Sequence, residues 1–113
     1  MTDIRIRKVE GSYVIRAGGA VLGESKDVLE LSEGKRAPVL YFPRNDIAMA
    51  FLDRSETATH CPHKGDASYF SIITKSKTIA DAAWSYETPI ANVERIKEYL
   101  AFADSDEVAI EKF

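Results

Sequence analysis

Residues 67–87 read ASYFSIITKSKTIADAAWSYE, and this stretch decides the fold class. Its first half alternates, so that Tyr69 and Phe70 begin two series of side chains on opposite faces of a β-strand. The polar residues 75–77 then interrupt the alternation as a turn does. Aromatic and small residues follow over 78–87, so the stretch is predicted to be two antiparallel strands joined by a tight turn.

Short segments of the same kind precede this hairpin. Isoleucines alternate with polar residues over 4–6, and alternation resumes at 13–15 after Gly11 and Ser12, which predicts a first antiparallel hairpin with its turn at Gly11. Gly18 and Gly19 predict the next turn. Further short strands are predicted over 21–22, 28–31 and 38–42, separated by a polar loop at 32–36.

Two short helices and two closing strands complete the expected architecture. Apolar residues three and four apart predict one helix within 44–52. Thr88 before Pro89 is typical of the start of a second helix, which reaches about residue 100. Closing strands are expected over 99–103 and 107–112. Residues 1–113 are therefore predicted to be a mainly β single domain of antiparallel strands with two short helices.

Composition limits the classes of function. The chain has 113 residues, of which 45% are hydrophobic and 29% charged, as expected for one globular domain with one core. A net charge of −3 offers no broad cationic field, so neither nucleic acid nor membrane is an expected partner. No apolar run approaches the roughly 20 residues of a membrane span. With one cysteine and no signal-peptide pattern, a cytoplasmic protein is expected.

The densest group of reactive side chains surrounds that cysteine. Cys61 is flanked by both histidines, His60 and His63. A thiol beside imidazoles could act as a nucleophile with its base. The alternative is that Cys61 is a small buried apolar residue and the histidines cap a loop, which leaves the roles of His60 and His63 open.

Metal and cofactor binding find less support. A closed zinc site normally has four ligands, and the chain has no other cysteine or histidine to complete one. Zinc would need Asp66 or Glu87 as additional ligands, so a structural zinc is not expected, no metal-ligating residue is assigned and any cofactor is left unknown.

A binding pocket is the second chemical possibility. Lys64 and Gly65 could hold an anionic group, although a tight turn with Gly65 at positive φ explains them equally. On a strand, Trp84 and Tyr86 share one face while Ser85 and Glu87 share the other. Pairing with the preceding strand would bring Tyr69 near these aromatic side chains and form a mostly apolar pocket with a few polar groups.

These motifs resemble a known family. The segments CPHKGDASY (61–69) and AWSYETP (83–89) are similar to the small bacterial domain of unknown function 427 family, and so are YFP (41–43), Asp46 and LAF (100–102). The resemblance implies a mainly β fold of the Mss4-like, β-tent type, without an established function. Other β-tent proteins bind zinc through two Cys-x-x-Cys pairs, and this chain has neither pair.

Two hypotheses about function follow. In the first, the 61–69 and 83–87 segments form a small-molecule pocket that either only binds its ligand or also catalyses a reaction, with Lys64 and Gly65 for an anion and Tyr69, Trp84 and Tyr86 as walls. If the pocket is catalytic, its reactive groups are expected to be Cys61, Asp66 and Glu87. In the second, the domain is a protein-interaction module whose Lys64 pairs with Asp66 or Glu87. Free sheet edges could be covered by a second copy, which would make a homodimer.

Overall fold

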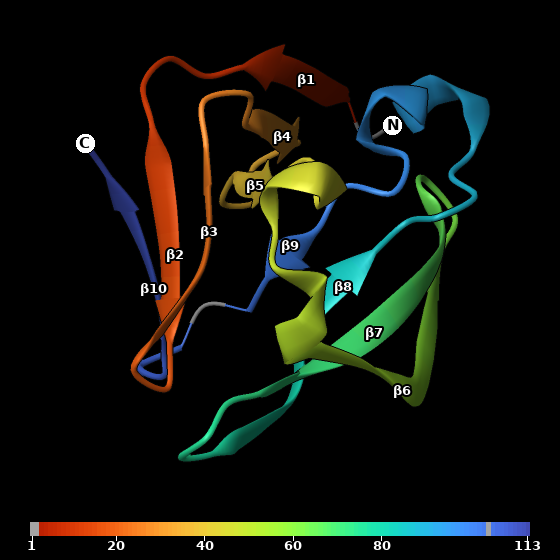
Figure 1. Cartoon of the computed structure of the whole chain (residues 1–113). Coiled ribbons are helices and arrows are strands. Elements are labelled where there is room, and N and C mark those ends of the chain that lie inside the picture. The colour runs from red at the N-terminus through yellow and green to blue at the C-terminus, as the bar shows by residue number, and fades with distance from the viewer. Residues whose placement is uncertain (1–2, 104) are drawn as a thin grey trace.

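The structure, a computed structural model, describes residues 3–103 and 105–113, and in this part of the chain ten strands form three antiparallel sheets. The sheets have the orders β1-β4-β5, β10-β2-β3 and β6-β7-β8-β9 (Figure 1). The predicted mainly β architecture is confirmed. The strands are β1 (Ile4–Lys8), β2 (Tyr13–Ala17), β3 (Ala20–Ser25), β4 (Leu29–Glu33), β5 (Val39–Tyr41), β6 (Leu52–Cys61), β7 (Gly65–Ile73), β8 (Thr78–Ser85), β9 (Ala101–Phe102) and β10 (Val108–Lys112).

The amino-terminal third is one long antiparallel ribbon bent at a corner. Strands β1 and β2 run in succession against β4 and β3, so Gly11 marks the corner and not a chain reversal. The predicted hairpin between β1 and β2 is therefore wrong. The two strands belong to different sheets because Val9 donates its amide hydrogen to the Val28 carbonyl and both side chains are buried at the bend. The predicted turn at Gly18 and Gly19 closes the ribbon as expected.

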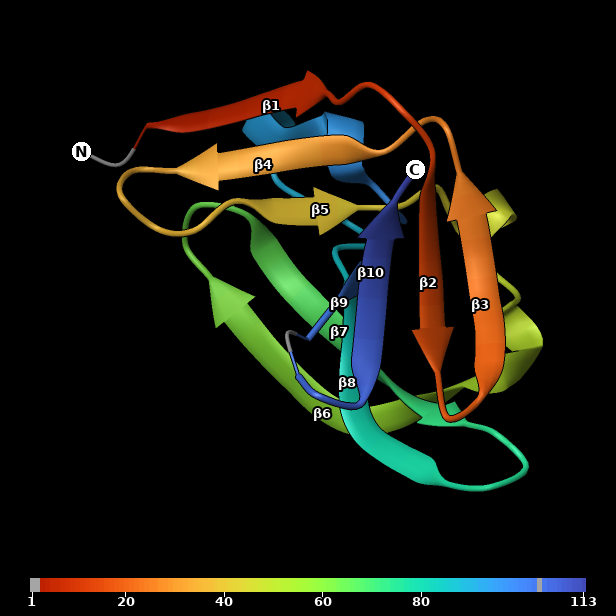
Figure 2. The same ribbon diagram turned by 90° about the vertical axis from the view of Figure 1, so that its left-hand side faces the viewer.

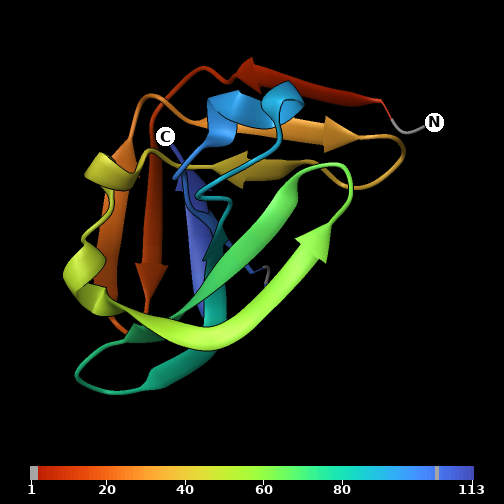
Figure 3. The same ribbon diagram turned by 90° about the vertical axis from the view of Figure 1, so that its right-hand side faces the viewer.

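The bend sets two sheets across one another, and the third sheet packs against both. In Figure 2 the strands β1, β4 and β5 run from side to side while β10, β2 and β3 run up and down. Figure 3 shows the β6–β7 hairpin passing diagonally below the first of these sheets. Buried residues form two clusters, one centred on Phe42 and Ile72 and one on Tyr41 and Ile96.

The predicted hairpin over residues 67–87 is confirmed as β7 and β8. Tyr69 lies opposite Trp84 in this register. The closing strands are also confirmed as β9 and β10, which pair with β8 and β2. The polar loop predicted over 32–36 begins later than expected, because β4 continues through Glu33 and buries its side chain.

Both predicted helices are present as short 3-10 turns: η1 (Arg44–Asp46) and η2 (Met49–Phe51) replace the first, and η3 (Ala91–Ile96) the second. Thr88 does not cap η3, which follows Ile90 and has no side-chain cap. Ile90 is held extended because its amide donates to the Lys64 carbonyl at 3.0 Å. No helix in the described residues is long and apolar enough to cross a bilayer.

The placement of η1 depends on a close approach that only glycine permits. A Cβ atom on Gly23 would lie 2.5 Å from the Asp46 carbonyl oxygen and 2.8 Å from Cδ1 of Ile47. We predict that Gly23→Ala lowers the free energy of unfolding by about 1–3 kcal/mol, as overpacking does in other cores. Urea denaturation measures the loss.

Gly19→Ala is the matched control for this variant. A Cβ on Gly19 meets nothing within 4 Å, and its φ of +80° adds only backbone strain. An equal or smaller loss for Gly23→Ala than for Gly19→Ala would contradict the packing argument.

Candidate functional site

The predicted site segments meet at the β6–β7 turn, where a lysine is buried. Lys64 follows Cys61 in a tight turn closed by a 3.1 Å hydrogen bond from the Lys64 amide to the Cys61 carbonyl. Its Nζ donates to Oε1 of Glu33 on β4 at 2.6 Å, and only 10% and 6% of the two side chains are exposed. The hydrogen bond from Lys64 holds the pKa of Glu33 below its ordinary value, so the pair is ionic. It joins the β6–β7 hairpin to the β1-β4-β5 sheet.

Beside this ion pair lies a cavity of about 330 Å³, which we call the aromatic cavity. Its size falls at the lower end of the range for small-molecule sites. Four aromatic side chains contribute to its walls, together with the ion pair: Tyr41, Tyr69, Trp84, Tyr86, Glu33 and Lys64. The remaining lining residues are Leu31, Arg36, Ala37, Val39, Asp81 and Ala103.

The aromatic side chains are fixed by contacts with one another and with the sheet. Trp84 Nε1 donates to the hydroxyl of Tyr41 at 3.4 Å, and the ring of Tyr69 lies 6.3 Å from that of Trp84. The Tyr69 hydroxyl is 3.2 Å from Oγ1 of Thr59. Burial raises the pKa of Tyr41 to about 12 and also raises that of Tyr86, so both phenols stay neutral. The cavity therefore has neutral, ordered walls.

The rim of the cavity carries two opposite charges. Arg36 has a side chain that is 76% exposed, and its Nη1 lies 3.8 Å from Oε1 of Glu33. Across the cavity, Oδ2 of Asp81 accepts a 2.7 Å hydrogen bond from Thr57. Hydrogen bonds from Ser55 and Thr57 lower the pKa of Asp81, so it is a carboxylate. Both acidic groups of the lining are thus already bonded to protein donors.

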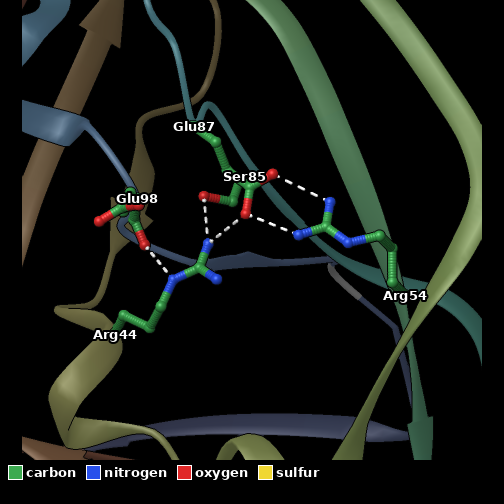
Figure 4. A network of polar contacts seen from close by, with 5 residues as sticks. All are labelled: Arg44, Arg54, Ser85, Glu87 and Glu98. Carbon is green, nitrogen blue, oxygen red and sulfur yellow. Dashed lines mark hydrogen bonds and ion pairs between the residues drawn. The ribbon is translucent and has the colours of Figure 1, made fainter.

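Glu87 lies outside this cavity, in a separate ionic cluster on the opposite face of β8 (Figure 4). Both carboxylate oxygens accept hydrogen bonds from Arg54 at 2.9 Å, and Arg44 adds a third at 3.1 Å. Arg44 also donates to Oγ of the buried Ser85 and to the carbonyl of Glu98. The expected alternation is observed. Trp84 and Tyr86 line the cavity, whereas Ser85 and Glu87 contact the arginines.

The two arginines of this cluster hold Glu87 in its charged form. Hydrogen bonding to Arg54 is the largest cause that lowers the pKa of Glu87 to about 2. Both guanidinium groups also lie over the ring of Phe70, at 5.6 Å for Arg44 and 5.0 Å for Arg54. The cluster connects η1, β6 and the end of β8, so its role in the fold is to hold these three segments together.

The three candidate catalytic residues lie at three separate places. Cys61 is half-buried at the end of β6 beside the Tyr41 cluster and does not line the cavity. Asp66 is exposed, with its Oδ1 2.7 Å from Nδ1 of His60. Glu87 is in the arginine cluster. The structure does not bring the three together, whereas it does place Lys64 with the candidate wall residues.

Two further residues of the predicted site segment, His63 and Gly65, lie at the β6–β7 turn. Gly65 has a φ of +111°, and a Cβ there would lie 3.3 Å from the carbonyl oxygen of Thr88. The residue therefore permits the β6–β7 turn to pack against the segment before η3. It does not line the aromatic cavity. His63 lies close enough to Glu33 to contribute a small lowering of its pKa.

Several residues of the site escape prediction from sequence. Glu33 falls within the polar loop predicted over 32–36, although it continues the two-residue period of Leu29 and Leu31 and so shares their buried face. Tyr41 follows Val39 in the same way on β5. No local pattern places Arg44 and Arg54 on Glu87, because these pairs span 43 and 33 residues.

In the described part of the chain, no three His, Cys, Asp or Glu side chains gather closely enough to hold a metal ion. Cys61 and Asp66 are not opposite one another, because the register pairs Cys61 with Gly65 and His60 with Asp66. Cys61 and the two histidines do not form such a group of ligands either.

Removal of one charge of the buried Lys64–Glu33 pair should destabilise the fold. We predict that Lys64→Met lowers the free energy of unfolding by about 3–5 kcal/mol, because it leaves the Glu33 carboxylate buried without its partner. The double variant Lys64→Met, Glu33→Leu removes both charges and should recover most of the loss. Urea denaturation of the four proteins forms a double-mutant cycle. Additive losses would show that the two side chains act independently.

The contribution of Glu87 to the stability of the fold depends on pH. Because the folded pKa of Glu87 lies below its ordinary value of 4.5, the carboxylate stabilises the fold above about pH 4.5 and this contribution disappears as the pH falls toward 2. Glu87→Gln should therefore cost about 1–2 kcal/mol at pH 7, after allowance for the half-exposed Arg54, and much less near pH 2.

Urea denaturation at both pH values measures this difference, and Glu56→Gln, an exposed acid on β6, is the control. A cost for Glu87→Gln that does not change between the two pH values would contradict the assignment.

The sequence matches a known protein family over nearly its whole length. The family described as Domain of unknown function (DUF427) matches residues 5–112, which include every strand from β2 to β10 and nearly all of β1. A search of curated proteins finds no match. Residues of the aromatic cavity and of the arginine cluster all lie within the matched range. The chain therefore belongs to the domain of unknown function 427 family.

Proposed function

We propose that this protein binds a small organic anion with a flat apolar ring in the aromatic cavity. The observation that carries the proposal is the coincidence of four aromatic walls with a buried lysine in one cavity of about 330 Å³. Aromatic and apolar walls with a few fixed polar groups are the usual composition of a small-molecule site. Seven of the twelve lining residues lie on β4, β5, β7 and β8, and the others lie on the segments that connect the strands.

The free hydrogen-bond donors favour an anion. An ammonium has three N–H donors, and Lys64 uses one of them on Glu33. Arg36 stands on the rim with most of its guanidinium exposed. By contrast, Glu33 and Asp81 already accept hydrogen bonds from protein side chains. A carboxylate or phosphate in the cavity would therefore find donors, whereas a cation would compete with existing partners.

Binding is a better match to the geometry than catalysis by the three candidate reactive residues. Cys61 and Glu87 do not line the cavity, and Asp66 is on the outer surface of the hairpin. General acid–base chemistry requires the acting group within hydrogen-bond reach of the reacting atoms. A ligand in the aromatic cavity would contact Tyr69 and Trp84 instead.

The sole tryptophan lines the cavity, so its fluorescence reports on occupancy. Benzoate, benzamide and benzamidinium share one shape and differ in charge. We expect benzoate to change Trp84 emission saturably with a dissociation constant in the millimolar range or below, as its size permits. Benzamidinium should bind at least tenfold more weakly, with benzamide between them. No saturable change with any of the three would overturn the proposal, and a preference for benzamidinium would overturn its anionic half.

Arginine variants provide the matched comparison. Arg36→Ala should weaken benzoate binding about three- to tenfold, because an exposed charged donor is lost. Arg16→Ala removes an exposed arginine from β2, where its partner is Glu111, and should leave the affinity unchanged. Equal effects of the two variants would assign the benzoate signal to general charge and not to this cavity.

A further inference from the structure

A second hollow adjoins the aromatic cavity and differs from it in chemistry. This hollow, the β5–β10 groove, has a volume of about 370 Å³. Its lining contains only apolar side chains: Ala37, Pro38, Val39, Leu40, Trp84, Phe102, Ala103, Val108 and Ile110. Strands β5 and β10 approach one another at the front of Figure 2, where each is the outermost strand of its own sheet.

The two hollows lie side by side and share part of their walls. Ala37, Val39, Trp84 and Ala103 line both of them. Trp84 therefore presents one part of its indole to the polar cavity and another to the apolar groove. A single ligand that crosses Trp84 would meet Lys64 and Arg36 at one end and apolar side chains at the other.

We propose that the ligand is an amphipathic anion whose ring and acid group occupy the aromatic cavity and whose alkyl chain lies in the β5–β10 groove. The proposal rests on the proposed function for its anionic end. An alkyl chain is the occupant because the groove is lined by apolar side chains and adjoins the proposed site for the anionic group. A partly exposed apolar residue, Ile110 at 37%, marks the open side of the groove.

Chain length separates this inference from the proposed function. Benzoate tests the aromatic cavity alone, and benzoates with methyl, butyl or hexyl groups at carbon 4 extend the same anion into the groove. We expect the dissociation constant, measured by calorimetry, to fall about three- to fourfold for each methylene until the groove is filled. If benzoate binds and longer chains bring no gain, the inference is overturned while the proposed function stands. If benzoate itself does not bind, the proposed function fails.

A variant that tests the groove must remove the affinity gained from the alkyl chain and leave the binding of the benzoate group unchanged. Ile110→Asn places a polar group on the open side of the groove, and should abolish most of the affinity gained between benzoate and 4-hexylbenzoate while leaving benzoate unchanged. Val21→Asn is the control, because Val21 is an exposed apolar residue, at 50%, on β3 and lines neither hollow. Loss of the gain in both variants would indicate nonspecific adsorption and overturn the inference.

Direct contact gives a readout that does not depend on any variant. In nuclear magnetic resonance spectra, 4-hexylbenzoate should show nuclear Overhauser contacts from its alkyl hydrogens to the methyl groups of Val108 and Ile110, and benzoate should show none. Sedimentation at the same concentrations tests the competing occupant, a second copy of the chain. A dimer that dissociates on Ile110→Asn, with no alkyl contacts, would overturn the inference in favour of a protein interface.

Discussion

The buried ion pair between Lys64 and Glu33 is the contact on which the candidate site depends. It joins the β6–β7 turn to β4, at the border of two sheets whose buried side chains also pack together in one hydrophobic cluster. A buried ion pair costs desolvation and is weak evidence for stability by itself. Its value here is positional, since the aromatic cavity opens directly beside it and takes Lys64 as part of its lining.

Strand β8 divides the chemistry of the protein between its two faces. Trp84 points into the hollow region near the β1-β4-β5 sheet, and Ser85 points to the arginine cluster. One face thus borders the aromatic cavity, whereas on the other face the Glu87 carboxylate pairs with two arginines. Through Glu87 the cluster ties the segment just after β8 to η1 and β6. This contact lies near the point where Trp84 is opposite Tyr69.

Local sequence patterns predicted the parts of this arrangement that depend on short-range periodicity. The β7–β8 hairpin and the division of Trp84 and Glu87 between two faces followed from alternation alone. What escaped prediction was every partner distant in sequence, including Glu33 for Lys64 and the two arginines for Glu87. The β1–β2 error has the same origin. A glycine signals that the chain changes direction, but only tertiary packing decides whether it reverses or turns a corner.

The same distinction explains why the three candidate catalytic residues, Cys61, Asp66 and Glu87, do not lie together in the fold. Cys61 and the histidines attract attention because such side chains carry chemistry, yet their neighbours in the fold are set by the hairpin register, which pairs Cys61 with Gly65. The cavity is instead lined by residues of β4, β5, β7 and β8 together with the connecting segments, including the β6–β7 turn, where two sheets meet. A ligand seated there would contact both sheets at once and bind only when they are packed together. Its binding energy would therefore be coupled to the stability of that packing, in addition to the contribution from the ion pair.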